Sequence, residues 1–295
     1  MFSLLLAAAL PFVFTERDAA IAFQNARTLV ETCTPRDAGT SGGRLAAQCI
    51  EKFATSAGLT VRRESFRAKT PRGERDFTNL TAELSNGSND GWVVLVSHYD
   101  TKTGVDCPGA NDGASTSGLL AGLAQALTRD GKARGNVMFI WTDGEECFDS
   151  YGPDDGLWGS KNLAERFVRE GRDVRAVICL DMLGDRDLAI TVPRNSTPSL
   201  VTSVIEAARR AGLAGLVKRG DSGVIDDHVP FLEKGFPAID LIDFRYGSTP
   251  DGNEYWHTSE DTVDKISEKS LLKVGRIVVE LLDILLSAPC TTSYN

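Results

Sequence analysis

The sequence lacks several features that would indicate common functional classes. It has no basic excess: 41 acidic residues against 32 basic ones give a net charge of −9, which argues against nucleic acid or an anionic membrane as the main partner. The modest glycine and proline counts, 28 and 11 among 295 residues, exclude collagen-like and low-complexity chains. No internal repeat or flexible linker divides the chain. With 42% hydrophobic residues, its length suits one large domain with its own core.

A hydrophobic run of membrane-spanning length, about 20 residues, is also missing. The apolar run at residues 2–14 has the length of a signal-peptide core, and small residues at 7–9 could serve a signal peptidase. No basic segment precedes it, so a buried N-terminal helix is the alternative. We expect residues 1–19 to form a signal peptide or an N-terminal apolar segment and residues 20–295 a single domain. The mature chain would then have no membrane span and be secreted or periplasmic.

Cysteine pairs with zinc-knuckle spacing are absent as well. None of the six cysteines lies in a C-x-x-C pair, so a structural zinc knuckle is not expected. Cys179, inside the apolar segment AVICL, is expected to be a small buried hydrophobe. The even count permits disulfides in an exported protein, for example between Cys33 and Cys49, but spacing alone does not establish a pairing.

Short apolar runs of the buried-strand type alternate with helical patterns along most of the chain. Strands are expected at residues 92–96, 137–141, 176–180 and 238–242. Helices are expected at residues 115–127, 160–169, 199–211 and 267–286. Upstream, residues 20–59 have two helical stretches around a turn at 35–43, and an alternating strand follows at 59–68. This order predicts a three-layer α/β/α sandwich, whose central mixed, largely parallel sheet is covered on both faces.

Polar residues directly follow three of these strands. His98 comes after the first strand, Glu145 and Glu146 after the second, and Asp181 after the third. Ligands of open α/β sheets bind at the carboxyl ends of the strands. We therefore expect these four side chains to gather at one edge of the sheet.

Together with Asp112 and His257, these residues make a histidine and carboxylate set suited to zinc in an open, catalytic site. Taken alone, Asp112 could be a plain helix N-cap, and adjacent glutamates are commonly solvated. A cation beside the glutamates would relieve their mutual repulsion. The chain has only three histidines, and all three (His98, His228 and His257) lie in segments of this kind, which favours a metal site.

An ordered set of segments resembles metallopeptidase family 28, the zinc aminopeptidase family, and within that superfamily is most similar to the animal-type glutaminyl cyclases. The segments are SHYDTK (97–102), GANDGAS (109–115), DGEE (143–146), LDMLG (180–184), DDHVPFL (226–232) and WHTSEDT (256–262), with a weaker likeness in TPRGERDFTNL (70–80). They span nearly the whole mature chain. The resemblance implies a zinc exopeptidase-like catalytic domain that acts on peptide N-termini.

The resemblance also implies roles for single residues. The zinc ligands would be Asp112, Glu146 and His257. Glu145 would be the general acid/base. In two-metal aminopeptidases the positions of His98 and Asp181 hold a second zinc, whereas in the cyclases one zinc is the rule and both residues are still present. We favour one ion, and the ligand set also accommodates two.

A second group of carboxyl groups carries the proton chemistry that the resemblance implies. In the cyclases the position of Asp181 belongs to a carboxylate hydrogen-bond network, and Asp226 would join it with Glu145. Close carboxylates cannot all ionise, so sharing a proton among them would raise one pKa. A raised pKa is what a carboxyl group needs to accept and return a proton near neutral pH.

Three further residues are expected to contact the substrate. Trp256 would form a wall of a small hydrophobic pocket for a glutamine side chain. The cyclases carry a tryptophan in the loop after the glutamate pair, and the matching residue here is Tyr151, which keeps an aromatic wall but alters its fit to glutamine. His228 would orient the reaction intermediate.

Glutaminyl-peptide cyclotransferase activity, which converts an N-terminal glutamine to pyroglutamate and releases ammonia, is the favoured function. The alternative is a dizinc aminopeptidase that hydrolyses N-terminal residues from peptides. A non-catalytic binding domain is a minor alternative that predicts gaps among the ligand positions, and the sequence has none. Under the two enzymatic readings the partners are peptides or proteins with a free N-terminus, and we expect a monomer.

Overall fold

The computed structural model describes residues 12–131, 133–249 and 251–287. Through this part of the chain runs one sheet, with its strands in the order β1-β2-β4-β3-β5-β8-β6-β7. The strands are β1 (Val61–Thr70), β2 (Gly73–Leu84), β3 (Trp92–His98), β4 (Val137–Thr142), β5 (Val174–Asp181), β6 (Ile190–Val192), β7 (Val217–Arg219) and β8 (Ala238–Ile242). The four central strands β4, β3, β5 and β8 are parallel, as predicted.

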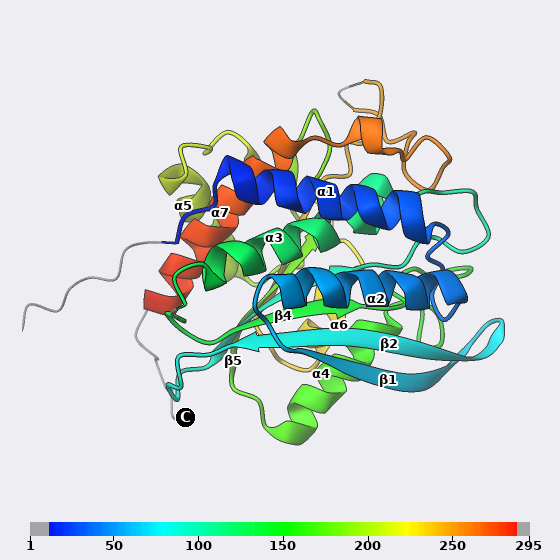
Figure 1. Cartoon of the computed structure of the whole chain (residues 1–295), viewed down its shortest axis with the longest axis horizontal. Coiled ribbons are helices and arrows are strands. Elements are labelled where there is room, and N and C mark those ends of the chain that lie inside the picture. The colour runs from blue at the N-terminus through cyan, green and yellow to red at the C-terminus, as the bar shows by residue number, and fades with distance from the viewer. Residues whose placement is uncertain (1–11, 132, 250, 288–295) are drawn as a thin grey trace, which may run out of the picture.

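Helices cover both faces of the sheet (Figure 1). One layer holds α1 (Glu16–Cys33), α2 (Ser41–Ser56), α3 (Thr116–Thr128), α5 (Pro198–Arg210) and α7 (Glu268–Ser287). The other holds α4 (Trp158–Glu170) and the short α6 (His228–Glu233), which pack on the sheet through Phe167 and Phe231. Since every residue of β4 and β8 is buried, the central strands need apolar partners on both faces. The predicted three-layer α/β/α sandwich is confirmed.

The edges of the sheet differ from the prediction. β2 had not been predicted; it forms an antiparallel hairpin with β1 and pairs antiparallel with β4. Its N-terminal half is polar and mostly exposed, so it lacks the apolar run that identified the central strands. The strands β6 and β7 have three residues each, too few for a periodic pattern.

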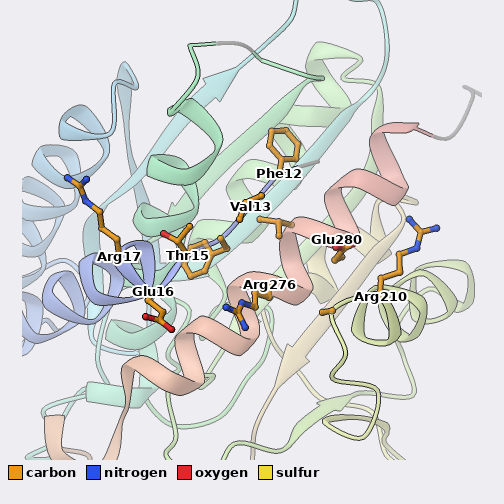
Figure 2. A pocket seen from close by; sticks show the side chains of 11 residues that line it. Phe12, Val13, Thr15, Glu16, Arg17, Arg210, Arg276 and Glu280 are labelled. Carbon is orange, nitrogen blue, oxygen red and sulfur yellow. The ribbon is translucent and has the colours of Figure 1, made fainter. Parts of the chain in front are cut away.

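The N-terminal apolar run lies mainly outside the described residues, which begin at Phe12. Phe12 and Phe14 are buried in the main core, and the Thr15 side chain caps α1. A hollow of about 660 Å³ lies beside this segment, between it, the end of α5 and α7 (Figure 2). None of the predicted site residues lines the hollow. Within the described ranges, no helix is long and apolar enough to cross a membrane.

Candidate metal centre

The three predicted strand ends meet at one edge of the sheet. β4, β3 and β5 are consecutive parallel neighbours, and His98 at the end of β3 is in register with Thr142 at the end of β4. Glu145 and Glu146 follow β4 within four residues, and Asp181 is the last residue of β5. The His98 Nε2 and Asp181 Oδ1 atoms are 3.1 Å apart. The strand order therefore brings together side chains that lie far apart in the sequence, as predicted.

Asp112 lies between the two histidines at the centre of the cluster. It belongs to the irregular helical turn η1 (Ala110–Ser115), which leads into α3. Its Oδ1 is 3.1 Å from His98 Nε2, and its Oδ2 is 3.2 Å from His257 Nε2. The next residue, Gly113, has φ +88°, and a Cβ there would lie 2.9 Å from the His98 ring. Only glycine tolerates both this backbone and this approach, so Gly113 allows the turn to pass against His98.

His257 reaches the cluster from the long loop after β8. Its Nε2 is 2.8 Å from Glu146 Oε1, and its backbone is left-handed at φ +58°. Such a conformation is unfavourable for a non-glycine residue and persists where the surroundings enforce it. The Trp256 ring stacks on the imidazole at 4.0 Å, and Phe244 meets the Trp256 ring edge-on. These contacts hold the ring of His257 toward Asp112 and Glu146.

The cluster consists of two overlapping triads that share Asp112. The inner triad is His98, Asp112 and Asp181; the outer triad is Asp112, Glu146 and His257. Within each triad the potential ligand atoms lie within 4.8 Å of one another. Imidazole nitrogen and carboxylate oxygen are ligands that zinc accepts. The buried Glu146 Oε2 has no hydrogen-bond partner, which fits a carboxylate that awaits a cation. The residues therefore fit a metal ion.

The raised pKa values of the two histidines also indicate a site for a positive charge. Burial alone would lower the pKa of His257, but its contacts with Asp112 and Glu146 raise it to about 9. In the same way, contacts with Asp100, Asp112 and Asp181 outweigh burial and raise the pKa of His98 well above its usual value. Each triad thus concentrates enough negative charge to favour a positive charge at its centre.

Glu145 lies next to the outer triad but contributes no atom to either one. It is buried, and its Oε1 accepts a hydrogen bond of 2.9 Å from the Tyr151 hydroxyl. Burial, followed by repulsion from Glu146 and Asp226, raises its pKa well above the usual glutamate value. A carboxyl group of this kind can hold a proton near neutral pH and pass it on, as expected of a general acid/base.

Behind Glu145 lies a second carboxyl cluster, which contains the predicted Asp226. The Cys179 thiol donates a 3.1 Å hydrogen bond to Asp226 Oδ1, and Asp240 is also close to both groups. Burial, and then repulsion by Asp181 and its neighbours, raises the pKa of Asp226 well above its usual value. Asp226 thus interacts electrostatically with both Asp181 and Glu145, and the proton shared among the three carboxyl groups stays a prediction.

The predicted substrate residues lie at different depths. Trp256 and Tyr151 are partly buried beside the outer triad, with direct contacts to His257 and Glu145 respectively. His228, the first residue of α6, is fully buried, and neither of its ring nitrogens has a hydrogen-bond partner. Burial lowers its pKa to about 4, so the ring is neutral at physiological pH. His228 belongs to neither triad.

Two aspartates that orient the cluster were not singled out from the sequence. Asp100 is fully buried, and its carboxylate accepts hydrogen bonds from the backbone N–H groups of Gly144, Glu145 and Glu146 at 2.9, 3.1 and 3.2 Å. Asp261 accepts bonds of 2.7 and 3.1 Å from the N–H groups of Asn111 and Asp112. Their presence in SHYDTK and WHTSEDT was the only available signal, because a bond to the backbone has no sequence pattern of its own.

Arg36 supports the backbone segment that leads into η1. It is fully buried, and its guanidinium donates to the carbonyl oxygens of Tyr99, Pro108 and Gly109 at 2.9, 2.8 and 2.8 Å. Gly109 immediately precedes η1, and a Cβ there would lie 2.6 Å from the Arg36 guanidinium. Arg36 therefore ties the α1–α2 connection to the loop between His98 and Asp112.

The α/β sandwich has a zinc exopeptidase-like fold, with a histidine and carboxylate cluster at the carboxyl ends of its parallel strands. The model of peptidase family M28 matches residues 79–282, and the chain belongs to that family. The resemblance found in the sequence is confirmed.

Curated and solved relatives bear names of two activities. Glutaminyl-peptide cyclotransferase of Drosophila melanogaster is 29% identical over 261 residues, covering 79% of this chain and 72% of the relative. The crystal structure of Acidobacteriales bacterium glutaminyl cyclase is 32% identical with a TM-score of 0.85, covering 95% of this chain and 97% of that one. A leucine aminopeptidase precursor from Bacteroides thetaiotaomicron shares the fold, with a TM-score of 0.81 at 22% identity and coverage of 94% and 99%.

Proposed function

We propose that this chain is a zinc-dependent glutaminyl-peptide cyclotransferase that acts on peptides with an N-terminal glutamine. The observation that carries this choice is the 32% identity to a bacterial glutaminyl cyclase over 95% of the chain. The geometry agrees with it, because a buried carboxyl with a raised pKa lies beside an open metal triad and two aromatic side chains.

Asp112, Glu146 and His257 would hold one zinc ion. When bound, zinc supplies Lewis-acid chemistry that polarises the γ-carboxamide of the substrate glutamine. The outer triad suits this role better than the inner one because the His257 side chain is 18% exposed, whereas that of His98 is 2% exposed. Substrate can therefore approach the outer triad.

Glu145 would move the proton in the reaction. The α-amine of the terminal glutamine attacks its own γ-carbon, and Glu145 takes a proton from that amine. It then gives the proton to the departing nitrogen, which leaves as ammonia. The Tyr151 hydroxyl holds Glu145 Oε1 in place during both steps, and repulsion from Asp226 supports the high proton affinity that the second step requires.

Trp256 and Tyr151 would form the wall around the glutamine side chain and keep water away from the reacting carbon. Cyclisation consumes no water, so an apolar wall favours it over hydrolysis. The neutral His228 would orient the intermediate as a hydrogen-bond partner rather than as a charge.

The second candidate is a dizinc aminopeptidase, and the inner triad favours it. His98, Asp112 and Asp181 are arranged as a complete second ligand set. In that reaction Glu145 would move the proton of the attacking water to the leaving amine. Both candidates use the same acid/base and the same outer triad.

Mass spectrometry of treated peptides separates the two activities. Zinc-loaded protein is incubated with matched peptides that begin with glutamine, leucine or alanine. A cyclase removes one ammonia from the glutamine peptide alone and leaves every peptide at full length. Clipping of whole residues from the leucine or alanine peptide would instead establish the aminopeptidase. The E145Q variant is the control, since it should be inactive in either case.

We also propose that the chain is exported and acts as a monomer. The apolar run at residues 2–14, which has the length of a signal-peptide core, supports export. N-terminal sequencing of the protein from the extracellular or periplasmic fraction tests this proposal. An intact N-terminus on protein found only in the cytoplasm would contradict it.

A further inference from the structure

Two cysteines in the helical layer have their sulfur atoms in contact. Cys33 is the last residue of α1, and Cys49 lies in the middle of α2. Their Sγ atoms are 3.5 Å apart, and the two residues are only 2% and 8% exposed. The catalytic proposal does not use either thiol.

The connection between these cysteines is built into the support of the metal cluster. It contains Arg36, whose guanidinium binds carbonyl oxygens at both ends of the loop between His98 and Asp112. It also contains Asp37, whose Oδ1 accepts a 3.1 Å hydrogen bond from the Thr101 hydroxyl. A Cβ at Gly42 would overlap the carbonyl oxygen of Pro35, so the connection lies directly on the first turn of α2. Any bond between α1 and α2 here would fix the base of this connection.

We propose that Cys33 and Cys49 form a disulfide that staples α1 to α2 and steadies the connection carrying Arg36. Forming the disulfide would bring the two sulfurs from 3.5 Å to about 2.05 Å apart. The oxidant is an external disulfide, either a small molecule or an oxidised dithiol protein. One thiolate attacks it to give a mixed disulfide and releases one thiol. The second cysteine then displaces the other half, so two protein thiols become one disulfide while the oxidant becomes two thiols.

The timing of this reaction follows from burial. Burial, together with the neighbouring Cys49 thiol, raises the pKa of the Cys33 thiol to about 12, so almost no thiolate exists in the folded chain at neutral pH. Exchange is therefore fastest while α1 and α2 are still packing together. Once formed, the disulfide is shielded from reductants by the same burial.

The disulfide would stabilise the fold chiefly by restricting the unfolded chain. The two residues are 16 positions apart, and closing a loop of that size should raise the melting temperature by about 5 °C. The staple should also slow local opening of the Arg36 connection.

Peptide mapping without reduction tests the pairing. The full chain is refolded with zinc in a glutathione redox buffer, and free thiols are blocked before digestion with trypsin. Cleavage at arginine and lysine puts Cys33 in residues 28–36, Cys49 in residues 45–52 and Cys107 in residues 103–129. We expect a linked pair of the first two peptides and an unlinked third. Free Cys33 and Cys49, or a link from either one to another cysteine, would overturn the proposal.

Melting temperatures provide the matched control. The C33S, C49S and C33S/C49S variants should lose the same amount of stability as each other, and a phosphine reductant that leaves zinc bound should lower only the wild-type value. Additive losses in the double variant would instead mean that the thiols contribute separately by packing, and the proposal would fail. If a variant does not fold, the comparison of oxidised with reduced wild type decides by itself.

Discussion

The two triads use similar ligands yet differ in construction. The inner triad combines two strand ends with η1, and all three of its side chains are buried. The outer triad depends on His257, which a long loop supplies in a left-handed backbone conformation, with its side chain 18% exposed. The inner set is thus rigid and closed, whereas the outer set is open and held in place by aromatic stacking. An ion that must keep a coordination position free for substrate belongs in the outer set.

The two triads also differ in the charged groups that surround their carboxylates. Glu146 in the outer triad has a pKa raised to about 7 by burial and by repulsion from Asp112. Its Oε1 is 2.8 Å from His257 Nε2, and its Oε2 is 3.6 Å from Lys102 Nζ. In the inner triad, His98 already lies between Asp112 and Asp181 at 3.1 Å from each. In the outer triad His257 lies between Asp112 and Glu146 in the same way, but Glu146 Oε2 is buried without a hydrogen-bond partner, so this triad has a further carboxylate oxygen for an ion.

Breaking the outer triad should have the largest effect. We expect H257A to lose its zinc and at least about 10³-fold in kcat/KM, because the polarising charge disappears with the ion. Metal analysis of the purified variant, together with the peptide assay, measures both effects. A variant that keeps one zinc per chain and most of its activity would show that the outer triad is not the essential one.

Removing the acid/base should cost nearly as much without removing the ion. E145Q keeps the shape of the side chain but cannot accept a proton, so we expect kcat to fall about 10²–10⁴-fold. Zinc content should equal that of the wild type. If E145Q loses its zinc as well, then Glu145 supports the ligand set, and its assigned role in proton transfer is incorrect.

The H98A variant tests whether the inner triad also holds a functional ion. With a single functional ion, this variant should keep one zinc per chain and lose about 10–100-fold in activity, as for a residue that only positions ligands. With two functional ions, zinc would fall from two per chain to one, and activity would fall as far as in H257A. Measuring the zinc bound per chain and the activity of H98A and H257A side by side therefore gives the number of functional ions.

The smallest expected effect concerns the hydroxyl of Tyr151. Its hydrogen bond to Glu145 favours the ionised carboxylate, so Y151F should raise the pKa of Glu145 and move the acidic limb of the kcat/KM profile to higher pH by about one unit. Y151W provides the matched control: it also lacks the hydroxyl but keeps a larger aromatic wall. An unchanged limb in both variants would mean that the bond does not tune Glu145.

The sequence predicted the site best where polar side chains directly follow a buried apolar strand. His98, Asp181 and the glutamate pair could be predicted at one edge because three buried strands end immediately before them. Asp112 and His257 were assigned to the same cluster from their residue types and then from resemblance, since both lie on irregular backbone that periodicity does not describe.

The supporting residues Arg36 and Asp100 could not be predicted from the sequence, for a different reason. Arg36 and Asp100 act through backbone carbonyl and N–H groups, which every residue possesses, so nothing in their partners' sequence marks the contact. Strand β2 was missed because one end of it is solvated and reads as a polar turn. Such features depend on tertiary context rather than on local pattern.

The hydrogen bonds that Asp100 accepts from three successive N–H groups limit how the substrate preference of this enzyme can change. One carboxylate sets the backbone from which both Glu145 and Glu146 project. A shift of that carboxylate would move the proton carrier and the metal ligand by the same displacement, preserving their mutual spacing. Changes in substrate preference are then expected in the loops of Tyr151 and Trp256, while Glu145 and Glu146 keep their relative position.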